Sequence, residues 1–275
     1  MKLHLLAAPL ALIATSAWAN DAADGSSGSR ASDATVASET PSPADTTEFE
    51  LASGIDYSVG SYGATSDTSV VSVPLDFKLR SGRFRGQISV PFVTVKGPGQ
   101  IVGGVVVPSS NNAVVSRSGL GDLGVSAAYL LSQQSGNLPA FELGVAAKVP
   151  TAKQTIGTGQ FDYSVNLSAY EALGHNATLF GSIGYSWLAS PAAYQLNNGI
   201  AASGGFNLRA APTTNLGFSV AYREPVATGL QGQATVSPYV THRLGGNVGL
   251  TLYGVAGLNQ ASPRVGAGLR LSIIR

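Results

Sequence analysis

The chain has 275 residues, of which 34 are glycine and 11% are charged, and it contains no cysteine. This composition is unusual for a soluble domain, and the lack of cysteine excludes a disulfide framework. The formal net charge of +1 gives no basis for nucleic-acid binding, which needs a basic patch and a recognisable motif. Beyond the N-terminus, no apolar run is long enough for a helical membrane span.

Residues 1–19 are typical of a cleavable secretory signal peptide. Lys2 is the basic start, Leu5 to Ala14 is apolar, and Ala17-Trp18-Ala19 has the A-x-A form of a cleavage site. An uncleaved anchor helix is the alternative, but the apolar run is short for one. We therefore predict an exported protein.

Residues 20–47 are rich in Ser, Ala, Thr, Asp and Gly and contain no aromatic residue. Such a segment buries too little apolar surface to offset its ordering entropy. The composition predicts a disordered periplasmic tail. A plug inside the lumen is the alternative, and it would need an apolar anchor that this segment hardly offers.

Residues 48–275 alternate apolar with small or polar side chains in short segments joined by Gly, Pro, Asn or Ser. In a transmembrane β-barrel, lipid-facing and lumen-facing residues alternate in this way. The pattern predicts an all-β, up-and-down antiparallel barrel of about 12 strands. The strands are expected over 49–59, 71–79, 84–92, 123–131, 141–149, 161–168, 179–187, 200–208, 216–222, 236–240, 248–252 and 265–273.

The joins predict the orientation of the barrel, because periplasmic turns are short and extracellular loops are long. Ser81-Gly82 and Gly245-Gly246 are examples of tight joins, whereas 96–117 and 150–159 are long ones. The segment Ser132 to Leu138 is longer than this rule expects. We therefore predict that the N- and C-termini are periplasmic.

Aromatic residues test the same arrangement, since they gather at the two membrane interfaces of a barrel and in the mid-strand core of a soluble β-sandwich. One predicted girdle, near the outer rim, comprises Tyr57, Phe92, Phe161, Tyr163, Tyr185, Trp187 and Tyr222. The other, near the periplasmic rim, comprises Phe49, Phe77, Phe84, Tyr129, Phe141 and Phe206.

Two motifs point to a family. Ser118-Gly119-Leu120-Gly121-Asp122-Leu123 opens one strand, and Lys148-Val149-Pro150-Thr151 ends the next, followed by Gly157-Thr158-Gly159 and Asp162. These motifs resemble the outer-membrane barrel family named for the meta-pathway of phenol degradation. The resemblance implies a bacterial outer-membrane channel for small, aromatic or otherwise hydrophobic compounds. Such barrels commonly end on an aromatic residue read by the barrel-assembly machinery, whereas this chain ends Ile274-Arg275.

The inner wall carries the charged residues in this register. The candidates for lining the lumen and contacting solute are Asp76, Lys78, Arg83, Arg85, Asp122, Glu142, Lys148, Asp162, Arg209, Arg223, Arg243, Arg264 and Arg270, with Glu50 and Asp56 on the same face. Basic residues are in surplus, so an open pore would mildly favour anions. The alternative is that the charges pair across strands and keep the interior closed.

The loop 96–117 contains an apolar stretch that is a candidate gate. Ile101, Val105 and Val107 lie beside Gly103 and Gly104, and the stretch could fold inward as a constriction. A hairpin that extends the barrel outward is the alternative, and the sequence slightly favours it.

Nothing in the sequence predicts catalysis or a metal site. Only His175 and His242 remain after signal removal, neither beside a nucleophilic Ser, and no ligand spacing for a metal or cofactor is recognisable. Gly119-x-Gly121-x-x-Gly124 fits the dinucleotide fingerprint but enters a strand, not a helix.

We therefore predict an outer-membrane channel that passes small solutes by passive diffusion. Its expected partners are outer-membrane lipid, the solutes and, during biogenesis, the barrel-assembly machinery; the sequence does not indicate an oligomeric state. The alternative function is a closed structural or surface-interaction barrel.

Overall fold

The computed structural model describes residue 41 and residues 43–102, 105–108, 113–192 and 195–275. The predicted signal peptide and most of the predicted tail lie outside these residues. The strands are β1 (Ala44–Gly60), β2 (Thr68–Gly82), β3 (Phe84–Gly97), β4 (Gly99–Val102), β5 (Val105–Pro108), β6 (Val115–Leu120), β7 (Leu123–Ser132), β8 (Ala140–Val149), β9 (Asp162–Leu173), β10 (Ala177–Leu188), β11 (Gly199–Ala211), β12 (Thr214–Arg223), β13 (Gln233–Gly245), β14 (Val248–Gly257) and β15 (Val265–Ile274). In the described part of the chain there is no helix long and apolar enough to span a membrane.

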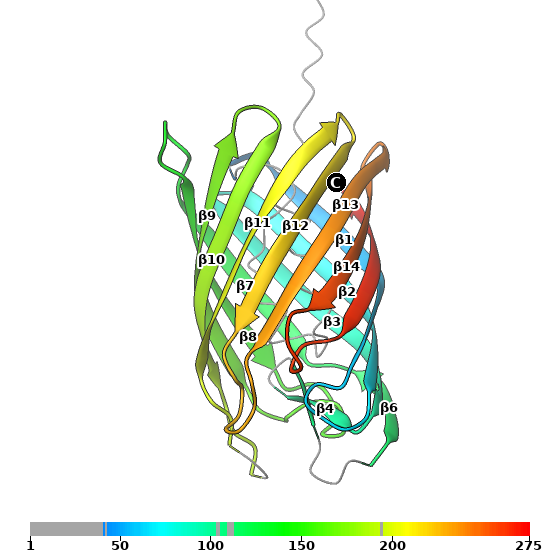
Figure 1. Ribbon diagram of the computed structural model, residues 1–275. Coiled ribbons are helices and arrows are strands. Elements are labelled where there is room, and N and C mark those ends of the chain that lie inside the picture. The colour runs from blue at the N-terminus through cyan, green and yellow to red at the C-terminus, as the bar shows by residue number, and fades with distance from the viewer. Residues whose placement is uncertain (1–40, 42, 103–104, 109–112, 193–194) are drawn as a thin grey trace, which may run out of the picture.

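The strands form one closed antiparallel barrel of 12 wall strands, as the sequence predicts (Figure 1). Neighbours in sequence pair in turn, and β15 closes the circle on β1, with Glu50 opposite Ile274 and Val59 opposite Val265. The segments β6 and β7 share one wall position, because β3 pairs with β6 near one end and with β7 near the other. The short strands β4 and β5 pair with each other as a separate hairpin.

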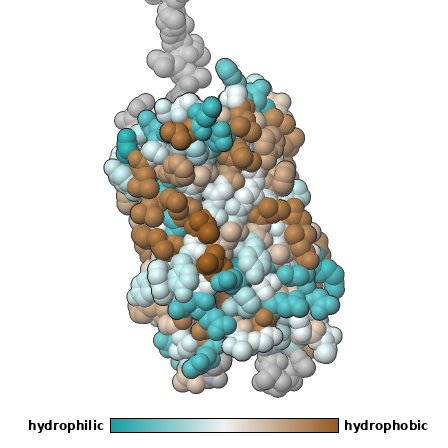
Figure 2. Space-filling model, turned by 60° about the vertical axis from the view of Figure 1, so that its left-hand side comes forward, coloured by the Kyte–Doolittle hydropathy of each residue, from teal (hydrophilic) through white to brown (hydrophobic). Residues whose placement is uncertain are grey.

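The two faces of the wall differ as strand alternation requires. On β1, Leu51 and Ile55 are about half exposed, whereas Ala52 and Asp56 are at most 2% exposed. Figure 2 shows hydrophobic side chains gathered over the outer wall and hydrophilic ones towards the ends of the barrel. An apolar outer face around a polar interior is the arrangement of a barrel that spans a lipid bilayer.

Aromatic rings lie on the outer face at both predicted levels. Trp187 on β10 stands opposite Tyr163 on β9 and makes an edge contact with Tyr185, with ring centroids 5.0 Å apart. At the other level, Phe49 on β1 packs against Phe77 on β2 with ring centroids 5.9 Å apart. These contacts fit two aromatic girdles, one at each membrane interface.

The two ends of the barrel differ in their connections. We call one the turn end, because tight joins such as Gly82 (φ 56°) and Gly246 (φ 52°) lie there, and the other the loop end. Figure 1 shows the start of β1 and the C-terminus at the turn end, and β4 and β6 at the loop end. The strand β1 begins at Ala44, so Ala44 to Thr47 belong to the wall and not to the predicted tail.

Candidate functional site

One side of the barrel interior holds a series of ion pairs between strands. Lys78 Nζ on β2 lies 3.5 Å from Glu50 on β1, and Arg85 on β3 pairs with Glu142 on β8, across β7. These four residues are at most 4% exposed. Charges this deeply buried need a partner, because desolvation strongly disfavours an isolated charge.

Two further inner-wall contacts involve aspartates. Arg270 Nη1 on β15 lies 3.0 Å from Asp76 on β2, and Ser89 donates a hydrogen bond of 2.5 Å to the same carboxylate. Tyr253 on β14 donates a hydrogen bond to Asp56 on β1. The Arg270–Asp76 and Tyr253–Asp56 contacts each reach over an intervening strand, so they connect parts of the wall that do not pair directly.

Lys148 is the centre of a cluster nearer the loop end. Its Nζ lies 2.9 Å from Asp162 and 3.3 Å from Asp122, and it donates a hydrogen bond of 2.8 Å to Thr158. Asp122 also accepts a hydrogen bond from the Ala152 amide. The two motifs that suggested the family therefore meet at one lysine, and Asp122 has a clear structural role there.

The fully buried part of the inner wall holds as many acidic as basic residues. Among the described residues, six basic side chains are buried inside (Lys78, Arg80, Arg85, Lys148, Arg223 and Arg270) against six acidic ones (Glu50, Asp56, Asp76, Asp122, Glu142 and Asp162). The deeply buried charges are therefore balanced, and the expected basic surplus depends on the half-buried Arg209 and Arg243, set against the half-buried Glu48.

Two predicted lumen residues, Arg83 and Arg264, lie elsewhere. Arg83 is exposed in the turn before β3, where its guanidinium donates to the Leu131 carbonyl at 3.2 Å. Arg264 is exposed in the loop before β15 and forms an ion pair with Asp67 at 2.7 Å, which raises the pKa of Arg264. Arg209 and Arg243 are half-buried at inward positions near the turn end of β11 and β13, each two residues after a buried inward residue, Asn207 or Thr241. The alternation of side chains does not predict the direction of Arg83 and Arg264, because each residue lies just before the first residue of its strand.

Arg80 is an inner-wall residue that the sequence analysis missed. It is 2% exposed and pairs with Glu48 at 3.7 Å. The predicted strand stopped at 79, whereas β2 continues to Gly82. Extending the alternation of Asp76 and Lys78 by one more step would have found it.

The opposite side of the interior, on β10, β11 and β12, is lined by small residues. Half-exposed positions on this inner face are Ser182, Gly184, Ser203, Gly205, Gly217 and Ala221. Ser182 and Ser203 share a hydrogen bond of 2.7 Å. The ring of Phe180 on β10 lies against Gly205, and the ring of Tyr239 on β13 lies against Gly217. The accessible part of the lumen is therefore limited to the other half-exposed positions, Ser182, Gly184, Ser203 and Ala221.

The β4–β5 hairpin folds inward at the loop end. Ile101 and Val106 on the hairpin pack with Val93 and Val95 of β3 and with Ile156 of the β8–β9 loop. Val95 and Val106 are at most 3% exposed. The slightly favoured interpretation of an outward hairpin is therefore wrong: both faces of the hairpin are apolar, and folding inward buries both.

The other contact of the hairpin is made with the far wall, and we call it the seam. It comprises Val102, Val105 and Val107 on the hairpin and Leu188, Leu196, Val226 and Leu230 on the ends and loops of β10 to β13. Leu188 ends the same strand that carries Ser182 and Gly184. The seam therefore covers the loop end of the small-residue side, where the accessible lumen would otherwise open.

The base of the hairpin is fixed to the wall. Thr68 Oγ1 at the start of β2 accepts a hydrogen bond of 2.9 Å from the Gly99 amide, and Arg117 donates one of 3.1 Å to the Gly99 carbonyl. Gly97 has φ of 144°, and a Cβ there would lie 2.6 Å from Thr68 Cα. Glycine permits this close approach.

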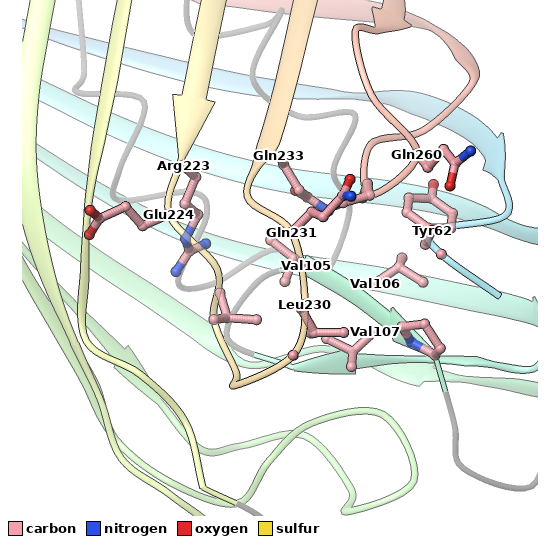
Figure 3. Close-up of a pocket in the computed structure, with 15 residues that line it drawn as sticks. Tyr62, Val105, Val106, Val107, Arg223, Glu224, Leu230, Gln231, Gln233 and Gln260 are labelled. Atoms are coloured by element: carbon pink, nitrogen blue, oxygen red, sulfur yellow. The ribbon is translucent and has the colours of Figure 1, made fainter.

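A cavity of about 210 Å³ lies beside the seam (Figure 3). Val105, Val107, Val226 and Leu230 give it an apolar side, and its polar side comprises Tyr62, Arg223, Glu224, Gln231, Gln233 and Gln260. Figure 3 shows these residues arranged around the cavity on the hairpin and on three other loop-end connections, with the Glu224 carboxylate turned away from Val105 and Leu230. The gate candidates Val105 and Val107 therefore line this cavity together with residues of the wall.

The two histidines lie away from these features. His242 Nδ1 is 2.9 Å from Thr214 Oγ1 near the turn end, and His175 is exposed in the β9–β10 turn. Within the residues that the structure describes, no group of three or more His, Asp or Glu side chains could hold a metal ion.

A closed antiparallel barrel with an apolar exterior, a polar interior and an inward hairpin at one end is the architecture of outer-membrane channels. The chain belongs to the family described as "Putative MetA-pathway of phenol degradation", whose model matches residues 19–274. The sequence resemblance is confirmed. No curated protein sequence matches the chain.

Two solved structures are similar to this fold. One is the COG4313 outer membrane channel from Pseudomonas putida F1, with a TM-score of 0.64 and 14% identity, over 86% of this chain and 97% of that one. The other is the NanC porin, with a TM-score of 0.52 and 8% identity, over 82% of this chain and 98% of that one. At these identities the likeness establishes the barrel fold.

Proposed function

We propose that this protein is a passive outer-membrane channel for small solutes, and that the β4–β5 hairpin is its constriction. The main support is the position of the seam: it covers the loop end of the small-residue side, where the lumen is accessible. A barrel with a purely structural role has no need of an accessible lumen that ends at one apolar contact.

The orientation belongs to the same proposal. Both described ends of the chain lie at the turn end, and short turns face the periplasm in bacterial barrels. The loop end and its hairpin then face the outside, where a solute enters. Export through a signal peptide at residues 1–19 and folding by the barrel-assembly machinery complete this placement.

The solutes are small and include aromatic or otherwise apolar compounds. The description of the family refers to phenol degradation, and the seam is lined by valine and leucine. The predicted lumen residues that lie on the inner wall, such as Asp76, Lys148 and Arg270, mainly form ion pairs there. We assign solute contact to the small-residue side and to the hairpin residues Ile101, Val105 and Val107.

Single-channel conductance in a planar bilayer tests the proposal. The signal-free protein should show small conductance steps, and a variant lacking residues 101–107 should show larger and longer ones, because the constriction is gone. As a matched control, shortening the exposed β7–β8 turn at Ser135 to Asn137 should leave conductance unchanged. A folded deletion variant that stays silent would contradict the proposal and support a closed structural barrel.

A further inference from the structure

The cavity and the seam share their apolar residues. Val105, Val107, Val226 and Leu230 line the cavity and also hold the hairpin against the far wall. A molecule that fills the cavity therefore touches the same side chains that keep the lumen closed.

We propose that this cavity binds a small uncharged apolar molecule about the size of one aromatic ring, and that binding releases the seam and opens the channel. The inference rests on the proposed channel function. It adds a specific binding site and a cause for opening.

The size of the cavity supports this class of molecule. Its volume is about 210 Å³, more than the roughly 150 Å³ that hold benzene in an apolar cavity, so one ring fits against the apolar side and leaves room at the polar side. With the seam closed, Val105 and Leu230 still contact the other seam residues, whereas a released hairpin lets the ring cover these faces as well, so the ring binds the released state more tightly. Releasing the hairpin then exposes little apolar surface to water, which keeps the energetic cost of opening low.

The charges at the cavity favour an uncharged molecule. One cation, Arg223, and one anion, Glu224, line it, and Glu224 already accepts a hydrogen bond of 2.7 Å from the Ile200 amide. Arg223 also interacts electrostatically with Asp162. An anion would bring its own charge against an apolar surface, where desolvation disfavours it.

The anchoring of the hairpin shows which part can move. Its base is hydrogen-bonded at Gly99 to Thr68 and Arg117, whereas the seam consists of apolar contacts. Apolar contacts are not directional, so a guest molecule can take over part of them. The hairpin therefore pivots on its base, and the seam side moves away from Val226.

Labelling of a single introduced thiol tests the inference, because the chain has no cysteine of its own. Val105 is 3% exposed, so Val105→Cys should react slowly with a water-soluble thiol reagent in the purified protein. Saturating toluene should accelerate this reaction about tenfold or more, since opening exposes the thiol. Sodium benzoate, which has the same ring but is charged, should not accelerate it.

Two variants serve as controls. Leu130 on β7 is fully buried near the turn end, and labelling of Leu130→Cys should not respond to toluene. Leu230→Trp, combined with Val105→Cys, fills the cavity and should abolish the response to toluene, whatever the basal rate is. An accelerated reaction of Leu130→Cys, or a response that survives Leu230→Trp, would overturn the inference.

The outcome also separates this inference from the channel function. A protein that conducts in bilayers while toluene leaves Val105→Cys labelling unchanged would overturn the release of the seam and leave the channel intact. Labelling as expected, in a protein through which no ion or solute passes, would refute the channel and retain the binding site.

Discussion

Arg85 on β3 and Glu142 on β8 form an ion pair across β7, although the two strands do not pair with each other. Both side chains are at most 3% exposed. Removing Arg85 leaves Glu142 buried with only Arg80 and the Tyr170 hydroxyl near it, and breaking a buried ion pair in this way typically costs about 3–5 kcal/mol.

Replacing Arg85 should therefore strongly destabilise the barrel. We expect Arg85→Met to lower the free energy of unfolding by about 3–5 kcal/mol, measured by urea unfolding in lipid vesicles. The double variant Arg85→Met with Glu142→Leu should recover most of this loss, because no charge is left buried. Arg83→Met is the matched control, since Arg83 is exposed, and an equal loss from it would contradict our assignment.

Replacing Lys148 should change ion selectivity at the loop end. Lys148→Met leaves the carboxylates of Asp122 and Asp162 without their shared cation, so the pore should shift towards cations. Reversal potentials across a salt gradient measure this shift. Lys153→Met removes an exposed charge from the neighbouring loop, and we expect it to leave the reversal potential unchanged.

Most of the fold could be predicted from the sequence because the alternation of side chains is a local property. Leu51 and Asp56 are assigned to opposite faces by counting residues along one strand, and the structure agrees. Counting fails where a strand stops: Arg83 follows Gly82 in the turn, and Arg264 precedes the start of β15 at Val265. The limits of strands depend on pairing with neighbours, which one segment does not reveal.

The candidate site was less predictable because it depends on distant contacts. The sequence identifies Ile101, Val105 and Val107 as apolar, but inward or outward folding depends on Val95 and Leu188, which lie on opposite sides of the barrel. Likewise, the balance of inner charges required the ends of the strands to be known. The local pattern of side chains was therefore enough to predict the barrel wall. The contacts across the lumen are known only from the structure.

Close packing of Tyr239 on β13 against Gly217 on β12 leads to a further prediction. A Cβ at position 217 would lie 2.4 Å from the ring and 2.5 Å from the Phe206 carbonyl. We expect Gly217→Ala to destabilise the barrel by about 1–3 kcal/mol through overpacking, measured by urea unfolding. Gly181→Ala is the control, because its nearest neighbour, the Ser203 carbonyl, is 3.5 Å away; equal losses would show that packing against Tyr239 is unimportant.

Loosening the base of the hairpin should make the channel open more often. Thr68→Val keeps the shape of the side chain but removes the oxygen that accepts the Gly99 amide at 2.9 Å, and leaving that buried donor unsatisfied costs about 1–3 kcal/mol. In the variant the base is no longer held by Thr68, so the pivoted hairpin lets water reach the Gly99 amide, whereas the folded-in hairpin leaves it buried. The equilibrium therefore shifts towards the open channel, which single-channel recording detects as longer openings of unchanged size. Ser69→Ala is the control, because Ser69 lies next to Thr68 on the outer face and makes only a weak hydrogen bond of 3.4 Å to the Lys96 carbonyl. This variant should leave the length of the openings unchanged. An equal effect from Thr68→Val and Ser69→Ala would show that the hairpin base does not control opening.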